Sequence, residues 1–242
     1  MKLFNTLRQK LLQENKTMSY LKYALGEILL VVIGILLAMK INTWNENSKD
    51  HETEIYILTE ILSNLKEERL VVDSLIGKRE KARIATAKML RYLADGKINE
   101  DSLSAHLVHF LTFERYFPIS NAYQILKSKG LKLSNRTLTS HISRYYDWEQ
   151  NRISRGVADI EEQIKPLFLN MNGIRRFLPT ITLNKTITVV HADDPNFRRE
   201  LFNEINNFKD NNNGTLDGLL LFMQKNTSLI KEIEEELKQL SK

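Results

Sequence analysis

The sequence predicts an all-α protein, in which an N-terminal transmembrane helix precedes a bundle of long helices with at most one short strand or hairpin. Three observations predict this class. Only 4 Pro and 9 Gly occur among the 242 residues, and the first proline is Pro118, so few residues interrupt helices. Residues 28–39 form an unbroken apolar run. Beyond that run, apolar residues recur at steps of three and four, which is typical of amphipathic helices.

The apolar run from Ile28 to Met39 is extended by apolar neighbours on both sides. From Leu21 to Trp44 a helix rises about 35 Å, which is enough to cross a hydrocarbon core of about 30 Å. A cleaved signal peptide and a buried core helix are the alternatives. A signal peptide should end in a small-x-small cleavage site, which LLAMKINTW does not provide. The flanks therefore favour a retained transmembrane helix over residues 21–44.

Basic residues are concentrated around this helix. Residues 1–44 carry six Lys and Arg against Glu14 and Glu27, whereas the remaining 198 residues carry 29 basic and 28 acidic side chains. Lys and Arg favour the cytoplasmic side of a membrane. We therefore expect a cytoplasmic basic tail over residues 1–20 and an extracytoplasmic, periplasmic helical domain over residues 45–242. The lipid bilayer is the predicted partner, and the balanced charge of this domain does not predict nucleic-acid binding.

The predicted span carries a carboxylate, Glu27, beside small residues. Gly34 and Ala38 form a small-xxx-small pair, and Gly26 lies on broadly the same helix face. Small residues let a second transmembrane helix approach closely, so this face is a candidate contact with a second copy or another membrane protein. Alternatively, Glu27 reaches the cytoplasmic interface or stays protonated, and the helix is only an anchor.

Apolar spacing predicts a first exported helix over residues 50–95, closed by Gly96 and with a possible break at Gly77. A second helix is predicted from Asp101 or Ser102 to about Phe113. A short third helix is predicted from about residue 120 to Gly130, after Pro118.

A long helix is predicted to open at Ser134 or Asn135 and to break or kink at Pro166. TITLNKTITVV alternates like a strand, with Ile181, Leu183, Ile187 and Val189 on one side. Asp194 and Pro195 predict the start of another helix. KDNNNG, at residues 209–214, is expected to be a loop before a final helix that opens at Thr215.

Aromatic residues cluster in two regions that are candidates for a ligand or partner pocket. If the regions pack together, tyrosine hydroxyls could orient a ligand, and otherwise the rings form the bundle core. The candidate residues are Tyr116, Tyr123, Tyr145, Tyr146 and Trp148.

The sequence predicts no metal site, cofactor or catalytic residue. His106 and His109 share a helix face but lack a third local ligand, and the HADD stretch at residues 191–194 commits Asp194 to a helix cap. The chain also contains no cysteine and no HExxH, GxSxG, P-loop or GxGxxG motif. We therefore do not expect an enzyme.

The stretches YALGEILLVVIGILLAMKINTWNE, at residues 23–46, and AYQILKSKGLKLSNRTLTSHISRYYD, at residues 122–147, resemble a domain-of-unknown-function family of single-pass membrane proteins found in Bacteroidota. The resemblance covers most of the chain. It implies an inner-membrane anchor and a helical exported domain, and it brings no activity, ligand or catalytic residue.

The sequence therefore favours a single-pass inner-membrane protein whose periplasmic domain is a non-enzymatic interaction or scaffold module. The alternatives are a sensor or regulatory subunit that acts through a partner chain, and a membrane-anchored enzyme.

Overall fold

The computed structural model describes residues 17–96, 99–182 and 186–242. The predicted basic tail lies largely outside these residues, as does Leu183 of the strand pattern. The chain divides into two compact units, residues 1–53 and residues 54–242. Helix α2, Thr17–Asp95, contributes to both units. The all-α prediction is confirmed.

The first unit is described as helix from Thr17 onward. Every residue from 28 to 52 is exposed to solvent, including the large apolar side chains of the predicted span. This helix is long and apolar enough to cross a membrane, and none of its apolar window is buried. It is therefore compatible with a single-pass membrane protein, although a core helix of a soluble protein or a signal sequence can have the same length and composition.

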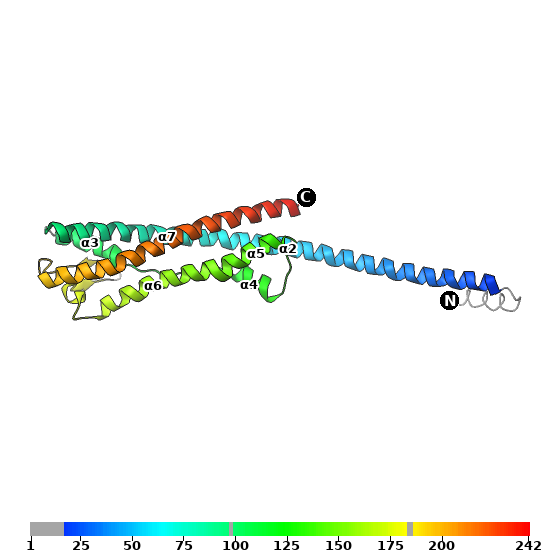
Figure 1. Ribbon diagram of the computed structural model, residues 1–242, viewed down its shortest axis with the longest axis horizontal. Coiled ribbons are helices and arrows are strands. Elements are labelled where there is room, and N and C mark those ends of the chain that lie inside the picture. The colour runs from blue at the N-terminus through cyan, green and yellow to red at the C-terminus, as the bar shows by residue number, and fades with distance from the viewer. Residues whose placement is uncertain (1–16, 97–98, 183–185) are drawn as a thin grey trace. The chain divides into compact units, whose positions relative to one another are not determined.

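The second unit contains the remaining elements. After α2 come the short helices α3 (Glu100–Phe110), α4 (Asn121–Ser128) and α5 (Arg136–Arg144). A π-helix, η1 (Tyr145–Glu149), leads directly into α6 (Gln150–Leu169). The 3₁₀ turn η2 (Ile174–Phe177) precedes β1 (Thr180–Ile181) and β2 (Ile187–Thr188), and α7 spans Pro195–Leu240. In this unit α7 runs beside both α2 and α6 (Figure 1).

Two apolar cores fill the second unit. One contains Leu58, Ile61 and Leu65 of α2 with Leu219 and Phe222 of α7. The other contains Met89 of α2, helix α3 and the N-terminal part of α7, where Phe110 and Phe208 pack edge to face with centroids 4.8 Å apart.

A polar layer separates the two cores. Arg79 of α2 is 3% exposed, and its Nη2 donates to the backbone oxygen of Thr112 over 2.6 Å. Burial lowers the pKa of Arg79, and the nearby Glu114 partly offsets this effect. On the facing helix, Nδ2 of the buried Asn212 donates to the Arg79 oxygen over 3.1 Å.

The predicted loop at residues 209–214 and helix start at Thr215 are wrong, because α7 is continuous from Pro195 to Leu240. The physical reason is tertiary. Asn211 donates to Gln163 of α6 over 2.9 Å, Asn212 donates to α2, and the Thr215 hydroxyl donates to the Gly156 oxygen over 3.1 Å. These bonds direct the donor groups of Asn211, Asn212 and Thr215 to other helices, whereas the same side chains would otherwise favour a loop.

The predicted helix caps are confirmed, whereas the predicted helix breaks and the single strand differ from the structure. Asn135 caps α5 by accepting from Leu138 N, and Asp194 caps α7 by accepting from Asn196 N, as predicted. Helix α2 passes through Gly77 without a break. Helix α6 continues through Pro166 and ends three residues later, at Leu169. The alternating segment forms not one strand but an antiparallel pair, with Thr180 opposite Thr188 and Ile181 opposite Ile187.

Candidate functional site

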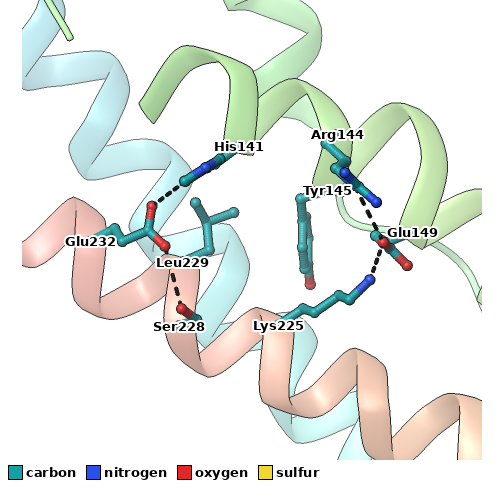
Figure 2. Close-up of a pocket in the computed structure, with 8 residues that line it drawn as sticks. All are labelled: His141, Arg144, Tyr145, Glu149, Lys225, Ser228, Leu229 and Glu232. Carbon is teal, nitrogen blue, oxygen red and sulfur yellow. Dashed lines mark hydrogen bonds and ion pairs between the residues drawn. The ribbon is translucent and has the colours of Figure 1, made fainter. Parts of the chain in front are cut away.

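A pocket with a volume of about 340 Å³ lies between α5, η1 and α7 (Figure 2). Each wall presents one helical face, because its residues recur at steps of three or four. The α5 and η1 wall carries His141, Arg144, Tyr145 and Glu149, and the α7 wall carries Lys225, Ser228, Leu229 and Glu232.

One end of the pocket is built around the carboxylate of Glu149, whose side chain is only 4% exposed. Its Oε1 atom pairs closely with Nζ of Lys225. Arg152 Nη2 lies 3.3 Å from Oε2, and Arg144 Nε lies 3.8 Å from Oε1. Three cations thus surround one carboxylate, which offsets the cost of removing that carboxylate from water.

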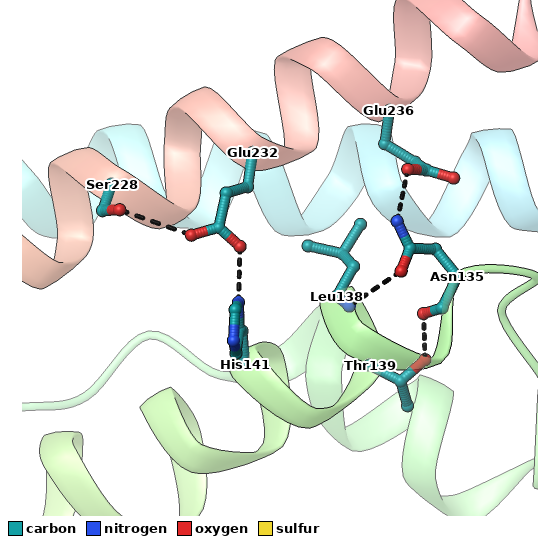
Figure 3. Close-up of polar contacts among 7 residues, drawn as sticks. All are labelled: Asn135, Leu138, Thr139, His141, Ser228, Glu232 and Glu236. Atoms are coloured by element: carbon teal, nitrogen blue, oxygen red, sulfur yellow. Dashed lines mark hydrogen bonds and ion pairs between the residues drawn. The ribbon is translucent and has the colours of Figure 1, made fainter.

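The other end of the pocket is built around Glu232. Its Oε2 atom accepts from Nδ1 of His141 over 2.6 Å, and its Oε1 atom accepts from the Ser228 hydroxyl over 3.3 Å. One turn further along α7, Glu236 accepts from the side chain of the capping residue Asn135 over 2.7 Å (Figure 3). These bonds hold α5 against α7 at its N-cap and in its C-terminal half.

Beneath the pocket, a buried network centres on Glu68 of α2, which is fully buried. Its carboxylate accepts from the hydroxyl of Tyr116, from the hydroxyl of Tyr145 over 2.7 Å, and from Nε2 of Gln150 over 2.6 Å. Asn226 of α7 donates to Tyr145 Oη over 2.9 Å. The network therefore joins α2, η1, α6 and α7 through neutral donors to one carboxylate.

Burial and the charge of Glu68 raise the pKa of the tyrosine hydroxyls in this region. Desolvation is the larger cause, and together with Glu68 it raises the pKa of Tyr116, Tyr145 and Tyr146 above the usual phenol value. All three hydroxyls therefore stay protonated at neutral pH, which disfavours a role as nucleophiles. The hydroxyls of Tyr116 and Tyr145 donate hydrogen bonds to Glu68.

The five aromatic residues predicted as a candidate pocket differ in their surroundings. Tyr116, Tyr123, Tyr145 and Tyr146 are buried, with Tyr123 and Tyr146 stacked at a centroid distance of 4.7 Å. Tyr145 stacks on Phe222 of α7 and is the one of the five that lines the pocket of Figure 2. Trp148 is 63% exposed.

Asp147 lies beside the stacked tyrosines. It accepts from the Tyr123 hydroxyl over 2.7 Å and pairs with Lys127 at 3.1 Å. The hydrogen bond from Tyr123 is the main cause that lowers the pKa of Asp147.

The residues of the predicted membrane face lie on α2 in the first unit. Gly26, Gly34 and Ala38 are exposed, and Glu27 is half-buried. A Cβ atom added at Gly26 or Gly34 would have no atom within 4 Å, so both positions leave room for close contact. Their role in helix association stays a prediction.

The histidines considered as metal ligands have other surroundings. His106 stacks on Tyr92 with centroids 5.8 Å apart, and burial is the main cause that lowers its pKa. His191 occupies a turn with a positive φ of 55°, and Asp194 is the cap of α7. Within residues 17–96, 99–182 and 186–242, no three His, Asp or Glu side chains converge as metal ligands would.

Comparison with known proteins identifies the family of this chain. A family of unknown function, DUF6090, matches residues 27–154, which is over half of the chain. The chain belongs to the DUF6090 family. No curated protein and no solved structure matches it.

The DUF6090 match extends from Glu27 in α2 to the fifth residue of α6. It therefore includes Glu68, the tyrosines of the buried network and the α5 wall of the pocket. The α7 wall, which carries Lys225 and Glu232, lies outside the matched residues.

Sequence reasoning missed the polar residues of the site. Glu68 interrupts the apolar spacing of Ile61, Leu65, Val72 and Leu75, and Asn226 interrupts that of α7 in the same way. A polar residue on an otherwise apolar helix face is the pattern that could have identified both. Two cations of Glu149, Arg144 and Arg152, are near it in sequence, whereas Lys225 comes from α7, 76 residues away, and only packing brings it to Glu149.

Proposed function

We propose that this DUF6090 protein is a single-pass inner-membrane protein whose residues 45–242 form a periplasmic interaction or scaffold module without enzymatic activity. The observation that carries the anchoring part is the apolar segment of α2 around residues 28–41, whose large side chains are exposed throughout. Exposure of so much apolar surface to water is unfavourable by about 25 cal/mol per Å². A lipid bilayer removes that cost, and the excess of basic residues before the segment sets the orientation.

The non-enzymatic part rests on how the second unit uses its reactive side chains. Glu68 is fully buried and saturated by three donors, and Glu149 is enclosed by three cations. Both carboxylates therefore fix helices to one another. A domain whose buried polar groups hold a rigid bundle suits the presentation of a surface to a partner.

Protease digestion tests the topology. With an epitope at each end of the chain, protease added to spheroplasts should remove the C-terminal epitope and spare the N-terminal one. Digestion after lysis should remove both and serves as the control for intrinsic cleavability. Protection of residues 45–242 in intact spheroplasts would contradict the proposed orientation.

We also propose that Gly26, Glu27, Gly34 and Ala38 of α2 contact another transmembrane helix, either a second copy or a different membrane protein. The test is crosslinking in membranes with Gly34→Leu and Glu27→Leu, compared with Leu36→Ile as a conservative control in the same span. Loss of crosslinked species in the first two variants alone supports the contact. If none of the variants weakens an association, the helix is only an anchor.

A sensor or regulatory subunit is the second candidate, and the pocket between α5 and α7 favours it. That pocket has room for a small ligand and joins helices that belong to different parts of the sequence, so occupation could change how they pack. Partner identification after gentle solubilisation of the intact protein, with and without Arg144→Gln, separates the two roles. Partners that change with the pocket variant favour regulation, and unchanged partners favour a scaffold.

A further inference from the structure

The cationic end of the pocket has more positive than negative charge. Arg144, Arg152 and Lys225 all pair with Glu149, which supplies a single negative charge. Arg152 lies outside the pocket lining, so the surplus at the pocket comes from Arg144 and Lys225. One carboxylate neutralises one of these two cations, and positive charge remains beside the pocket. A bound anion would balance it in a partly enclosed site, where charges interact more strongly than in bulk water.

Arg144 is the cation best placed to receive such an anion. Its side chain is 73% exposed, and its Nε atom lies 3.8 Å from Glu149, which is longer than a charge-assisted hydrogen bond of about 2.7–2.9 Å. The planar guanidinium can therefore take a carboxylate through two parallel hydrogen bonds without first breaking a close bond. Lys225, 37% exposed and across the pocket on α7, adds a second positive charge.

The middle of the pocket is apolar. Tyr145 and Leu229 lie between the two polar ends in Figure 2, and both line the pocket. A volume of about 340 Å³ is near the lower end of small-molecule sites, which range over about 300–1,000 Å³. The space suits a small molecule with an apolar body.

The far end of the pocket disfavours a second negative charge. Glu232 is held there by His141 and Ser228. On α7 it lies seven residues beyond Lys225, a rise of about 10 Å. A dicarboxylate that reached both ends would place like charges together, and such repulsion excludes ligands effectively.

We propose that this pocket binds a small monocarboxylate whose carboxylate pairs with Arg144 and Lys225 and whose apolar body covers Tyr145 and Leu229. This inference goes beyond the interaction role proposed above. It does not depend on that role, because a scaffold and a sensor can both carry the site.

Binding can be measured on the full chain in lipid nanodiscs by ligand-observed NMR titration. Hexanoate is the probe, and adipate, its dicarboxylate counterpart of equal carbon number, tests the charge rule. We expect saturable binding of hexanoate and at least tenfold weaker binding of adipate. Empty nanodiscs give the background from partition of the probe into lipid.

Variants locate the binding. Arg144→Gln should weaken hexanoate binding about tenfold, which corresponds to one charge-assisted interaction. Arg155→Gln, an exposed arginine of α6 outside the pocket lining, is the matched control and should leave binding unchanged. Ser228→Phe, which changes an exposed residue and fills the pocket, should abolish binding without altering the charges.

Three results would overturn the proposal: hexanoate binding that does not saturate, equal affinity for adipate, or equal loss in Arg144→Gln and Arg155→Gln. Circular dichroism of each variant verifies that it is folded, so that affinities are compared only between folded proteins. Should Ser228→Phe fail to fold, Arg144→Gln still decides the outcome, because its side chain is mostly exposed.

Discussion

Replacement of Glu68 by Leu should destabilise the second unit markedly. The change leaves the hydroxyls of Tyr116 and Tyr145 without their buried acceptor, whereas Gln150 keeps a second acceptor, the Ile119 oxygen at 3.3 Å. Each buried donor left unsatisfied costs about 1–3 kcal/mol. Removal of a buried charge returns part of this cost, so we expect a net loss of about 3 kcal/mol.

Thermal unfolding of the full chain, followed by circular dichroism, measures this loss. For a domain of this size about 3 kcal/mol lowers the midpoint temperature by about 6–12 °C. Glu67→Leu is the matched control, because Glu67 is the exposed neighbour of Glu68, and it should change the free energy of unfolding by no more than about 0.5 kcal/mol.

A combined variant tests the cause. Glu68→Leu with Tyr116→Phe removes one donor together with the acceptor and keeps the Tyr145 hydroxyl that accepts from Asn226, so it should be more stable than Glu68→Leu alone. If Glu68→Leu unfolds at the same temperature as the unmodified protein or higher, the network does not stabilise the fold and the reasoning is refuted.

Three further predictions concern stability. Because the pKa of Tyr116 and Tyr145 is raised in the fold, these phenols ionise above about pH 10 in the unfolded chain before they ionise in the folded protein. Their contribution to the free energy of unfolding is therefore complete below about pH 10 and declines above it. The difference between the unfolding midpoints at about pH 8 and pH 11 should therefore be smaller in the Tyr116→Phe, Tyr145→Phe double variant than in the unmodified protein. An unchanged difference would contradict this assignment. Gly77→Ala should stabilise α2 by about 0.5–1 kcal/mol in thermal unfolding, because a Cβ there has no atom within 4 Å, and a lower midpoint would show a hidden clash. Asn212→Ala should cost about 1–2 kcal/mol in denaturant unfolding, through loss of the bond to the Arg79 oxygen, and an unaltered midpoint would count against the polar layer as a stabilising contact.

The local sequence determined where several helices begin and which segment is apolar enough for a membrane. Asn135 and Asp194 are followed by their own helices, and each cap bond reaches only two or three residues along the chain. The apolar run at residues 28–39 needs no partner to be recognised. Such features depend on neighbours in sequence, so composition and spacing reveal them.

Tertiary structure decided the rest. KDNNNG is helical because Asn211 and Asn212 bond to other helices, which overrides the local preference for a loop. Tyr116 and Tyr145 became donors to Glu68, because packing places the α2 carboxylate beside residues that lie 48 and 77 positions away in sequence. The pocket itself requires α5 and α7, whose paired residues His141 and Glu232 are 91 positions apart. A polar residue on an apolar helix face can mark one side of such a contact, but its partner is decided only when the helices pack.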